Sequence, residues 1–271
     1  MVEPAGGRGP GVIVIQEWWG LDDHIADVCN RFAREGFVAL APDLFGGRVA
    51  HNEEEAMTLA GQLNPEQAVT ELSGAVDFLL EHPSVTGGAV GVVGFCMGGA
   101  FVLHLAARAG EKVAAAVVFY ATLQGDEDFS GIRAAVQGHF GEHDQFVPPD
   151  RAREAMEKLR QAGVPVQVHF YDAGHAFFND TNKLGTYNEE LARLAWSRTL
   201  DFLRSHLAAR LSLLRLLRHC YCGTVPSVSS PSGTSACSLR SGSPAESACS
   251  WSRAAKSDSP NPRPIRLCTS W

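Results

Sequence analysis

The chain lacks several features that would assign it to broad classes of protein. Cysteine is scarce in positions 1–209, where only Cys29 and Cys96 occur, so this part holds no framework of several disulfides. No stretch reaches the roughly 18 apolar residues that a membrane-spanning helix needs. A basic segment followed by an apolar one, as in a secretory signal, is missing from the N-terminus. We therefore expect a protein of the reducing cytoplasm.

Basic charge is also scarce before position 211. Positions 211–271 hold 7 Lys+Arg against 2 Asp+Glu, which leaves 16 against 28 in the preceding part of the chain. An acidic protein surface does not neutralise phosphate, so we expect neither a nucleic-acid nor a membrane partner. A small-molecule substrate and a monomer or weak homo-oligomer are the expectations that remain.

Short apolar runs alternate with longer amphipathic stretches, which is the pattern of parallel strands joined by helices. Strands are expected at 12–15, 37–41, 89–93, 113–119, 134–140 and 166–171. Helices are expected at 23–35, 53–62, 65–81, 97–107, 151–162 and 189–207. Because the strands are almost continuously apolar, helices should cover both faces of the sheet. The pattern predicts one α/β domain over residues 1–209.

Residues 210–271 are rich in Ser, Pro and Gly and show no apolar period, which predicts a disordered tail. The leucines up to Leu217 are an alternative extension of the last helix. Cys220 and Cys222 form a pair without a second pair at ligand spacing, so a zinc site is not favoured. We expect neither a metal nor a cofactor.

The strongest motif is Gly94-Phe95-Cys96-Met97-Gly98-Gly99, which follows an apolar run and precedes an Ala-rich segment. It has the form of the Gly-x-Ser-x-Gly turn of α/β-hydrolases, with cysteine in place of serine. Such a turn exposes the nucleophile and directs the next backbone N–H, here that of Met97, at the developing oxyanion. A buried structural thiol is the alternative role for Cys96. The flanking glycines favour a nucleophile.

Two polar loops later in the chain supply a base and a residue to orient it. Asp144 and His175 each follow an expected strand, and the order nucleophile, acid, histidine is that of α/β-hydrolases. Asp144 has an alternative role as a turn former. His143 is the nearest competitor for the base, but it and Asp144 lack a third ligand at regular spacing, so metal catalysis is not favoured.

The loop Gln16-Glu17-Trp18-Trp19-Gly20 follows the first expected strand. This is where hydrolases supply the second oxyanion N–H, and Trp18 is the candidate. Glu17 lies between apolar residues, so burial is expected to favour its exchange of a proton with Cys96. The alternative is a solvated Glu17 beside tryptophans of the core.

These motifs resemble the dienelactone hydrolase family, also called carboxymethylenebutenolidases, over Gly11 to Leu207. The resemblance rests on Gln16–Gly20, Ala41–Phe45, Gly91–Gly99, Gly141–Asp144 and Ala173–His175. It implies an α/β-hydrolase fold that cleaves an ester or lactone through a Cys96-His175-Asp144 triad and an acyl-enzyme. It further implies that Glu17 assists formation of the thiolate and that the backbones of Met97 and Trp18 form the oxyanion hole.

The sequence departs from the family at two places. In the family's best-known members an arginine four residues after the catalytic histidine holds the carboxylate of dienelactone, and here that position is Asn179; Arg48 is the nearest candidate for a second such arginine. Aromatic residues instead predict a less polar substrate. The residues expected to contact it are Trp19, Phe119, Tyr120, Phe177 and Asn179, with Trp18 and Phe178 in the same aromatic set. The second departure is a Gly/Pro-rich stub before Val12, which predicts a sheet shortened at that edge.

Two other functions compete with this one. A cysteine-elbow enzyme of the amidotransferase-like class would place its histidine soon after the nucleophile, where the chain offers only His104. A small-molecule binding module on the same fold would retain the pocket without turnover. The late loops of Asp144 and His175 favour the hydrolase.

Overall fold

The computed structural model describes residues 1–121 and 128–220. The strands are β1 (Gly9–Ile15), β2 (Val38–Leu40), β3 (Val85–Phe95), β4 (Val113–Phe119), β5 (Ala135–Gly141) and β6 (Val166–Tyr171). The helices are α1 (Asp23–Arg34), α2 (Glu53–Gly61), α3 (Pro65–Glu81), α4 (Met97–Ala109), α5 (Pro149–Gln161) and α6 (Glu189–Cys220), with a short 3-10 helix at Gly110–Lys112. Element types therefore follow the expected alternation of strands and helices.

The strands form one sheet in the order β2-β1-β3-β4-β5-β6, and every neighbouring pair is parallel. In chain order, β2 is added next to β1 at one edge of the sheet. The later strands, β3 to β6, are added in turn on the other side of β1. The strand order thus reverses between β1 and β3, whose ends are in register with Ile15 beside Gly94. Open α/β sheets bind ligands outside the carboxyl ends of the strands at such a reversal.

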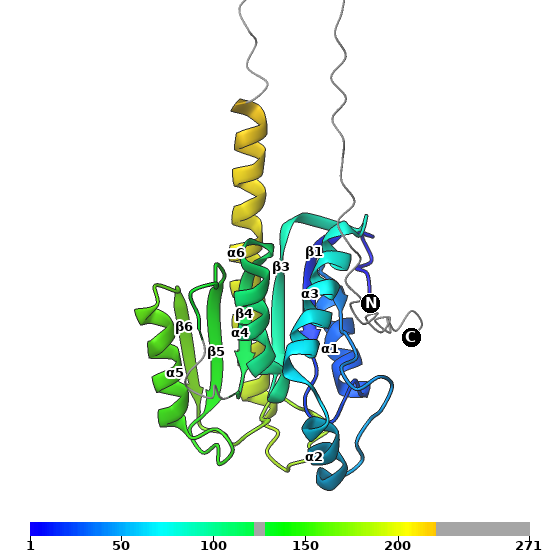
Figure 1. Ribbon diagram of the computed structural model, residues 1–271, viewed down its shortest axis with the longest axis vertical. Coiled ribbons are helices and arrows are strands. Elements are labelled where there is room, and N and C mark those ends of the chain that lie inside the picture. Colours follow the sequence, from blue (N-terminus) through cyan, green and yellow to red (C-terminus); the bar gives the residue numbers. More distant parts are fainter. Residues whose placement is uncertain (122–127, 221–271) are drawn as a thin grey trace, which may run out of the picture.

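Alternate residues of each strand enter two separate cores. In β1, Ile13 and Ile15 belong to the core that also contains side chains of α3, α4 and α5, whereas Val12 and Val14 belong to the core that contains side chains of α1 and α6. Figure 1 shows the helices on the two faces of the sheet, with α3 and α4 crossing in front of it. Because both faces are covered, the strands are apolar throughout, as expected for a parallel sheet. The α/β-hydrolase architecture predicted from the sequence is confirmed.

Helix starts follow local capping chemistry. The side chains of Asp22, Asn52 and Asn64 accept hydrogen bonds from backbone N–H groups in the first turns of α1, α2 and α3. Each cap satisfies a donor that has no partner inside the helix. Pro65 occupies the first turn of α3, where its missing N–H costs nothing.

The structure differs from the predicted boundaries mainly in β3 and at the two ends of the chain. β3 begins four residues before the expected Ala89, since Val85 and Thr86 pair with Gly9 and Pro10 across a register shift. Val2 forms a single antiparallel bridge with Ala39, so the N-terminal stub contacts the edge strand without adding a strand of its own. Helix α6 continues to Cys220, in agreement with the leucine-rich alternative. The rest of the predicted tail, residues 221–271, lies outside the described residues.

Candidate active site

Cys96 lies on a tight turn between β3 and α4, at the carboxyl end of the central strands. Its backbone has φ 51° and ψ −118°, a conformation that costs a residue with a side chain of order 1–3 kcal/mol. The N–H of Cys96 donates to the carbonyl of Phe119 at 3.0 Å, and its own carbonyl accepts from Gly99 at 3.0 Å. These bonds hold the strained turn in place.

Glycine is required on both sides of this turn because backbone segments approach closely. A Cβ at Gly94 would lie 2.3 Å from the carbonyl oxygen of Gly98. A Cβ at Gly98 would lie 2.3 Å from the carbonyl oxygen of Gln16 and 2.5 Å from that of Ile15. The glycines of the motif thus let α4 begin directly against the end of β1.

Three side chains from distant loops form a continuous hydrogen-bonded chain. The Nε2 atom of His175 lies 3.1 Å from the sulfur of Cys96, and its Nδ1 atom lies 2.8 Å from Oδ2 of Asp144. A carboxylate only accepts, so Nδ1 carries the proton and Nε2 presents its lone pair to the sulfur. His175 and Asp144 are both buried. The arrangement suits His175 to remove a proton from Cys96.

Asp144 combines the two roles considered for it. Its Oδ1 atom accepts hydrogen bonds from the N–H groups of Phe146 at 2.9 Å and Val147 at 2.8 Å, which forms the turn after β5. Its Oδ2 atom is thereby aimed at His175. Next to His175, the side chain of Thr186 donates to the carbonyl oxygen of His175 itself.

The thiol of Cys96 is held in its protonated form by its surroundings. Burial raises its pKa well above the ordinary value, and the negative charge of Glu17 raises the pKa further. Hydrogen bonds from the backbone N–H groups of Met97 and Trp18 lower the pKa by a smaller amount. These two N–H groups therefore lie close to the sulfur.

Glu17 is buried beside the nucleophile but forms its own hydrogen bonds elsewhere. Its Oε1 atom accepts from the Tyr120 hydroxyl at 2.9 Å, and its Oε2 atom accepts from Nδ2 of Asn179 at 2.8 Å. The Oδ1 atom of Asn179 accepts from both the N–H and the hydroxyl of Thr181. Because that oxygen is occupied, the amide of Asn179 can only present donors to Glu17. The position of the family's arginine is thus held by a neutral donor.

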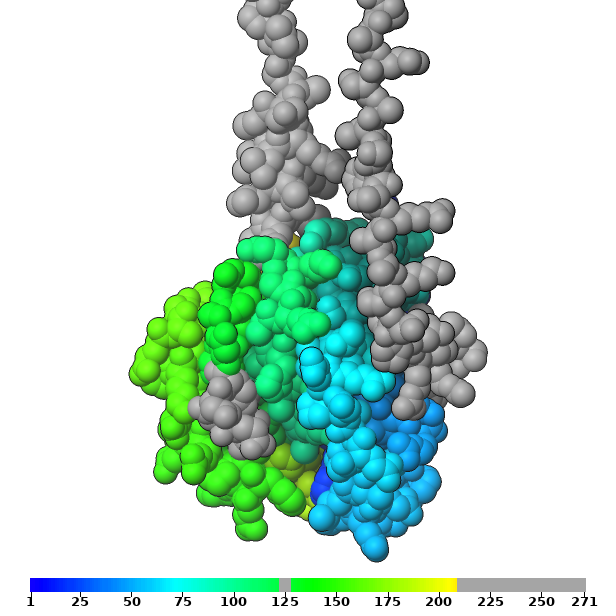
Figure 2. Space-filling model, viewed as in Figure 1, coloured from blue at the N-terminus to red at the C-terminus, as the bar shows by residue number. Residues whose placement is uncertain are grey.

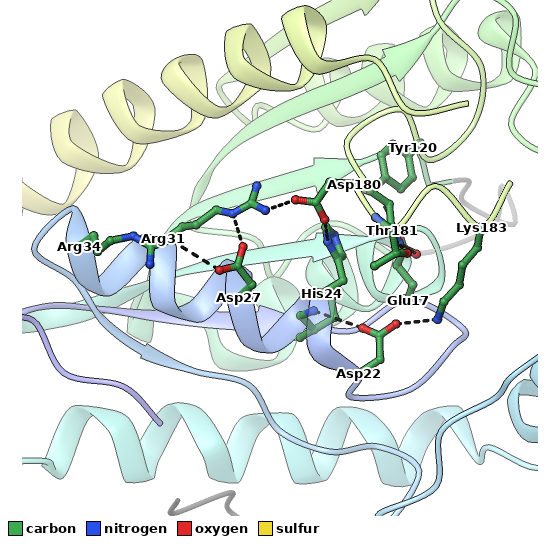
Figure 3. Close-up of polar contacts among 12 residues, drawn as sticks. Glu17, Asp22, His24, Asp27, Arg31, Arg34, Tyr120, Asp180, Thr181 and Lys183 are labelled. Carbon is green, nitrogen blue, oxygen red and sulfur yellow. Dashed lines mark hydrogen bonds and ion pairs between the residues drawn. The ribbon is translucent and has the colours of Figure 1, made fainter. Parts of the chain in front are cut away.

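The loop that carries Asn179 is docked along α1, from its N-cap Asp22 to Arg31 in its last turn (Figure 3). Asp180 binds Nδ1 of His24 at 2.9 Å and also pairs with Arg31, and these contacts lower the pKa of Asp180. Lys183 binds Asp22 at 2.8 Å. His24 is buried, so this docking fixes the loop from the protein interior.

A cavity of about 980 Å³ opens onto the sulfur of Cys96. Near the sulfur it is bounded by Trp18, Tyr120, Phe146 and His175. Figure 2 shows blue and yellow-green surface recessed between the cyan and green parts of this face. The volume lies at the upper end of the range for small-molecule sites.

The structure places the residues predicted to contact substrate in different environments. Tyr120 lines the cavity, as does Trp18. Phe119 and Phe177 are completely buried in the core, Trp19 packs against Ala50 and Ala56, and Asn179 binds Glu17; none of these four lines the cavity. Alternation along a strand and aromatic content cannot tell a core ring from a pocket ring.

Two residues near or in the cavity wall, Arg108 and Phe146, were not predicted from the sequence. Arg48 binds Gln62 and the carbonyl of Phe45, away from the cavity, whereas Arg108 of α4 lines it. Phe146 lies with its ring centroid 4.9 Å from that of His175. Its spacing could have predicted Arg108, because it lies 11 positions after Met97 and residues 11 positions apart fall on one face of a helix.

Cys29 differs from Cys96 in being packed as a structural residue. Burial raises the pKa of Cys29 to about 12, and this thiol packs in the core cluster that includes α6, as a structural cysteine does.

No cluster of three or more candidate metal ligands occurs among residues 1–121 and 128–220. Over the same residues, no helix has the length and apolarity to cross a membrane.

Comparison with known proteins places these features in context. Residues 1–207 match the model of the dienelactone hydrolase family. The chain is 36% identical over 207 residues to protein usf of Aquifex pyrophilus, covering 73% of this chain and 89% of that protein. It is 32% identical over 213 residues to the carboxymethylenebutenolidase of Pseudomonas sp. strain P51, covering 74% and 87%. A solved dienelactone hydrolase-like promiscuous phosphotriesterase from metagenomic libraries superposes with a TM-score of 0.65 at 26% identity, covering 76% of this chain and 88% of that one.

Proposed function

The chain belongs to the dienelactone hydrolase family, and from this premise we propose that it cleaves an ester or lactone through an acyl-enzyme on Cys96. Members of the family are hydrolases of ester or lactone bonds. The observation that carries the proposal is the unbroken chain from the Cys96 sulfur through His175 to Asp144, at 3.1 Å and 2.8 Å. Each of these three residues follows the end of a different strand.

In the proposed reaction, Cys96 loses its proton to Nε2 of His175 as the sulfur attacks the substrate carbonyl. The carbonyl oxygen becomes an oxyanion that accepts from the N–H groups of Met97 and Trp18. Collapse of this intermediate forms the acyl-enzyme, and the proton on His175 passes to the departing alkoxide. Asp144 stabilises the imidazolium and keeps its orientation.

Water then releases the acyl group. His175 removes a proton from the water, whose oxygen attacks the thioester carbonyl and forms a second oxyanion at the same two N–H groups. Breakage of the carbon–sulfur bond yields a carboxylic acid, and the proton held by His175 returns to the sulfur. In a lactone the departing alkoxide stays attached to the acyl group, so the product is a single hydroxy acid.

Glu17 enters the proposal as a residue that controls the nucleophile. It lies where its charge raises the pKa of Cys96, so the resting sulfur is a thiol protected from oxidation and from unselective attack. Both carboxylate oxygens of Glu17 are bonded, one to Tyr120 and one to Asn179, whereas His175 faces the sulfur and takes its proton. We propose that Glu17 assists this transfer only after bound substrate has released it from these two bonds.

The loop that carries Asn179 also limits which substrates suit the site. A neutral Asn179 holds Glu17, and among the described residues the mainly apolar lining of the cavity contains one arginine, Arg108, remote from the elbow. A small substrate whose carboxylate must be held beside the reacting carbonyl is therefore disfavoured. Neutral esters or lactones suit the site.

The test is steady-state and burst kinetics with chromogenic esters. Cys96→Ala should lower turnover by at least 10³-fold, the scale at which loss of a nucleophile acts, with unchanged circular dichroism. Wild-type protein should show a burst of one leaving group per active site if deacylation is slower than acylation, and mass spectrometry should find the acyl group on Cys96. Cys29→Ala is the matched control and should retain turnover. Undiminished turnover by the Cys96→Ala protein would exclude the proposed nucleophile.

A further inference from the structure

The cavity at Cys96 continues far beyond the reacting atoms. Six residues of α4 line it, namely Met97, Ala100, Phe101, His104, Ala107 and Arg108. Their spacing places them on one face of the helix, over three turns. At 1.5 Å per residue, this face extends roughly 17 Å from the nucleophile along the helix axis.

The other walls of the cavity are provided by neighbouring elements. Ala60, Pro65 and Val69, from α2 and α3, face the helix on one side, and Gly131 lies in the wall at the far end. Along the length of the helix most of these side chains are small or apolar, and the charged residues Glu66, Arg108 and Asp128 are exposed. The result is a groove with apolar walls, reactive sulfur at one end and charged side chains at its margin.

Small side chains keep this groove open. Ala100 lies on the helix face one turn from Cys96 and Ala107 lies near its far end, and larger residues at either position would project into the space. At the end near Cys96 the rings of Trp18, Tyr120 and Phe146 enclose the cavity, whereas farther along α4 the rings of Phe101 and His104 line one wall beside the alanines. The geometry therefore limits the group bound at the reacting carbonyl more than it limits the length of the group that extends away from it.

We infer that the substrate is an ester with an extended apolar chain, on the order of 15 Å long, that lies along α4 from Cys96 toward Arg108. This inference rests on the proposed hydrolysis at Cys96 and specifies its substrate class. Burying successive methylene groups against the alanines and Phe101 adds binding energy that a short ester does not gain. Longer chains are expected to raise kcat/KM until the groove is filled.

The experiment compares two series of esters of increasing chain length. In p-nitrophenyl acyl esters from acetate to tetradecanoate the chain is on the acyl side, whereas in alkyl acetates it is on the alcohol side. For wild-type protein, kcat/KM should rise at least tenfold from the shortest to the optimal member of one series. The series in which kcat/KM rises identifies whether the acyl chain or the alcohol chain occupies the groove. A rise in either series supports the inference.

Variants that block the groove at two depths give the decisive readout. Ala100→Trp should limit turnover to short chains, and Ala107→Trp, or Ala107→Leu if the tryptophan protein does not fold, should allow intermediate lengths. In both variants kcat/KM for the acetate ester should fall less than kcat/KM for the long-chain esters. Thr70→Trp is the matched control, because Thr70 is exposed next to Val69 and does not line the cavity. A flat length profile, or equal cut-off lengths in all variants, would overturn the inference.

A binding measurement separates this inference from the proposed reaction. Methyl decanoate and methyl acetate are titrated into the Cys96→Ala protein, with the fluorescence of Trp18 in the cavity wall as one readout and calorimetry as another. Affinity should rise at least tenfold with the longer chain, and Ala107→Trp in the same background should remove most of this gain. If wild type hydrolyses no ester but this pattern holds, the proposed function fails and the groove assignment stands. Equal affinities would overturn the assignment.

Discussion

At the scale of single residues, the two cysteines show that a raised pKa does not mark a nucleophile. Burial raises the pKa of both Cys29 and Cys96. What separates them is their contacts: Cys96 faces Nε2 of His175 and two backbone N–H groups, whereas Cys29 packs in a core cluster. Reactivity at Cys96 therefore depends on proton transfer to an aligned base during attack rather than on a thiolate present at rest.

Replacing Glu17 with Gln should change the resting thiol and the reaction in opposite directions. The charge of Glu17 raises the pKa of Cys96, so its removal lowers that pKa and increases the thiolate fraction at a given pH. Alkylation of Cys96 by iodoacetamide at pH 7–8 should accelerate by about tenfold per pKa unit lost, whereas acylation by an ester should slow if Glu17 assists proton removal. Stopped-flow acylation and thiol labelling measure the two rates.

Asp172→Asn is the control for this change, because it also removes a carboxylate just past the end of a strand, here β6, but at an exposed site paired with His143. It should leave both rates as in wild type. Alkylation of Glu17→Gln that is no faster than wild type would contradict the electrostatic role of Glu17. An unchanged acylation rate would remove Glu17 from the chemical step.

At the scale of elements, strand ends bring strained residues to the site. Cys96 follows β3, Tyr120 follows β4 and Ala176 lies just past β6, and each has a positive φ. Such conformations persist only where surrounding packing and hydrogen bonds enforce them. The backbone of Tyr120 donates to the carbonyl of His139 at 2.8 Å, which fixes its ring next to Glu17 and His175.

Gly98→Ala should test how closely α4 must approach β1. The added Cβ would meet the backbone oxygens of Gln16 and Ile15, which cannot rotate away as a side chain would. We expect the free energy of unfolding to fall by about 3 kcal/mol. Turnover of any ester should fall as well, since the shift would move the Met97 N–H away from the sulfur. Urea denaturation monitored by fluorescence measures the first effect.

The matched control is Gly61→Ala at the end of α2, where an added Cβ meets nothing within 4 Å. Alanine favours helix over glycine, so this variant should gain up to about 1 kcal/mol. If Gly98→Ala were as stable and as active as this control, the close contact between α4 and β1 would not be required.

Much of this arrangement of elements could be predicted from local pattern. The apolar runs predicted six strands because burial on both faces leaves few polar positions in each strand. Chain order and strand ends likewise predicted that Cys96, Asp144 and His175 belong to one edge. The start of β3 was missed because Gly87 and Gly88 carry no apolar signal, although the strand there continues beside β1.

Contacts between polar side chains were less accessible to prediction. Glu17 binds Tyr120 and Asn179, and Asp180 binds His24, across separations of more than a hundred residues. Periodicity reports which positions are buried but not which buried donors and acceptors meet. The same limit explains why Phe119 and Phe177, expected in the pocket, are core residues.

At the scale of the whole molecule, the two core clusters lie within the region that matches the family model. The buried residues of one cluster extend to Val164 and those of the other to Leu207, and the family model matches residues 1–207. One side of the sheet contributes α4 and the groove, and the other contributes α1 and α6, on which the loop after His175 rests. Global unfolding therefore separates the triad and the groove at the same time.

A buried polar cluster makes this global stability depend on pH. His139 of β5 is fully buried and binds Tyr171, Gln137 and Thr199. Burial lowers the pKa of His139 well below its usual value, and the positive charges of His169 and Arg198 lower it further. The folded protein thus keeps His139 neutral at a pH where the unfolded chain binds a proton.

The sign of the effect follows from this difference in bound protons. Stability due to a neutral buried His139 is fully present above the unfolded-state pKa of about 6.5 and is lost as pH falls below it. The free energy of unfolding should decrease by about 1.4 kcal/mol per pH unit from this residue between about pH 6 and pH 5. His139→Gln cannot titrate and should show a shallower slope, although its stability at pH 7.5 is lower because hydrogen bonds are lost. Urea denaturation at half-unit pH intervals measures both slopes.

His51→Gln supplies the comparison, since His51 is exposed before α2 and is solvated in both states. Its slope should match that of wild type, so that only the buried histidine accounts for the difference. His169, whose pKa is also lowered by burial, should leave a smaller residual slope in the His139→Gln protein. Parallel slopes for wild type and His139→Gln would mean that the cluster admits a proton, or water, without unfolding. The loss of stability in acid would then have to come from groups outside the β5–α6 interface.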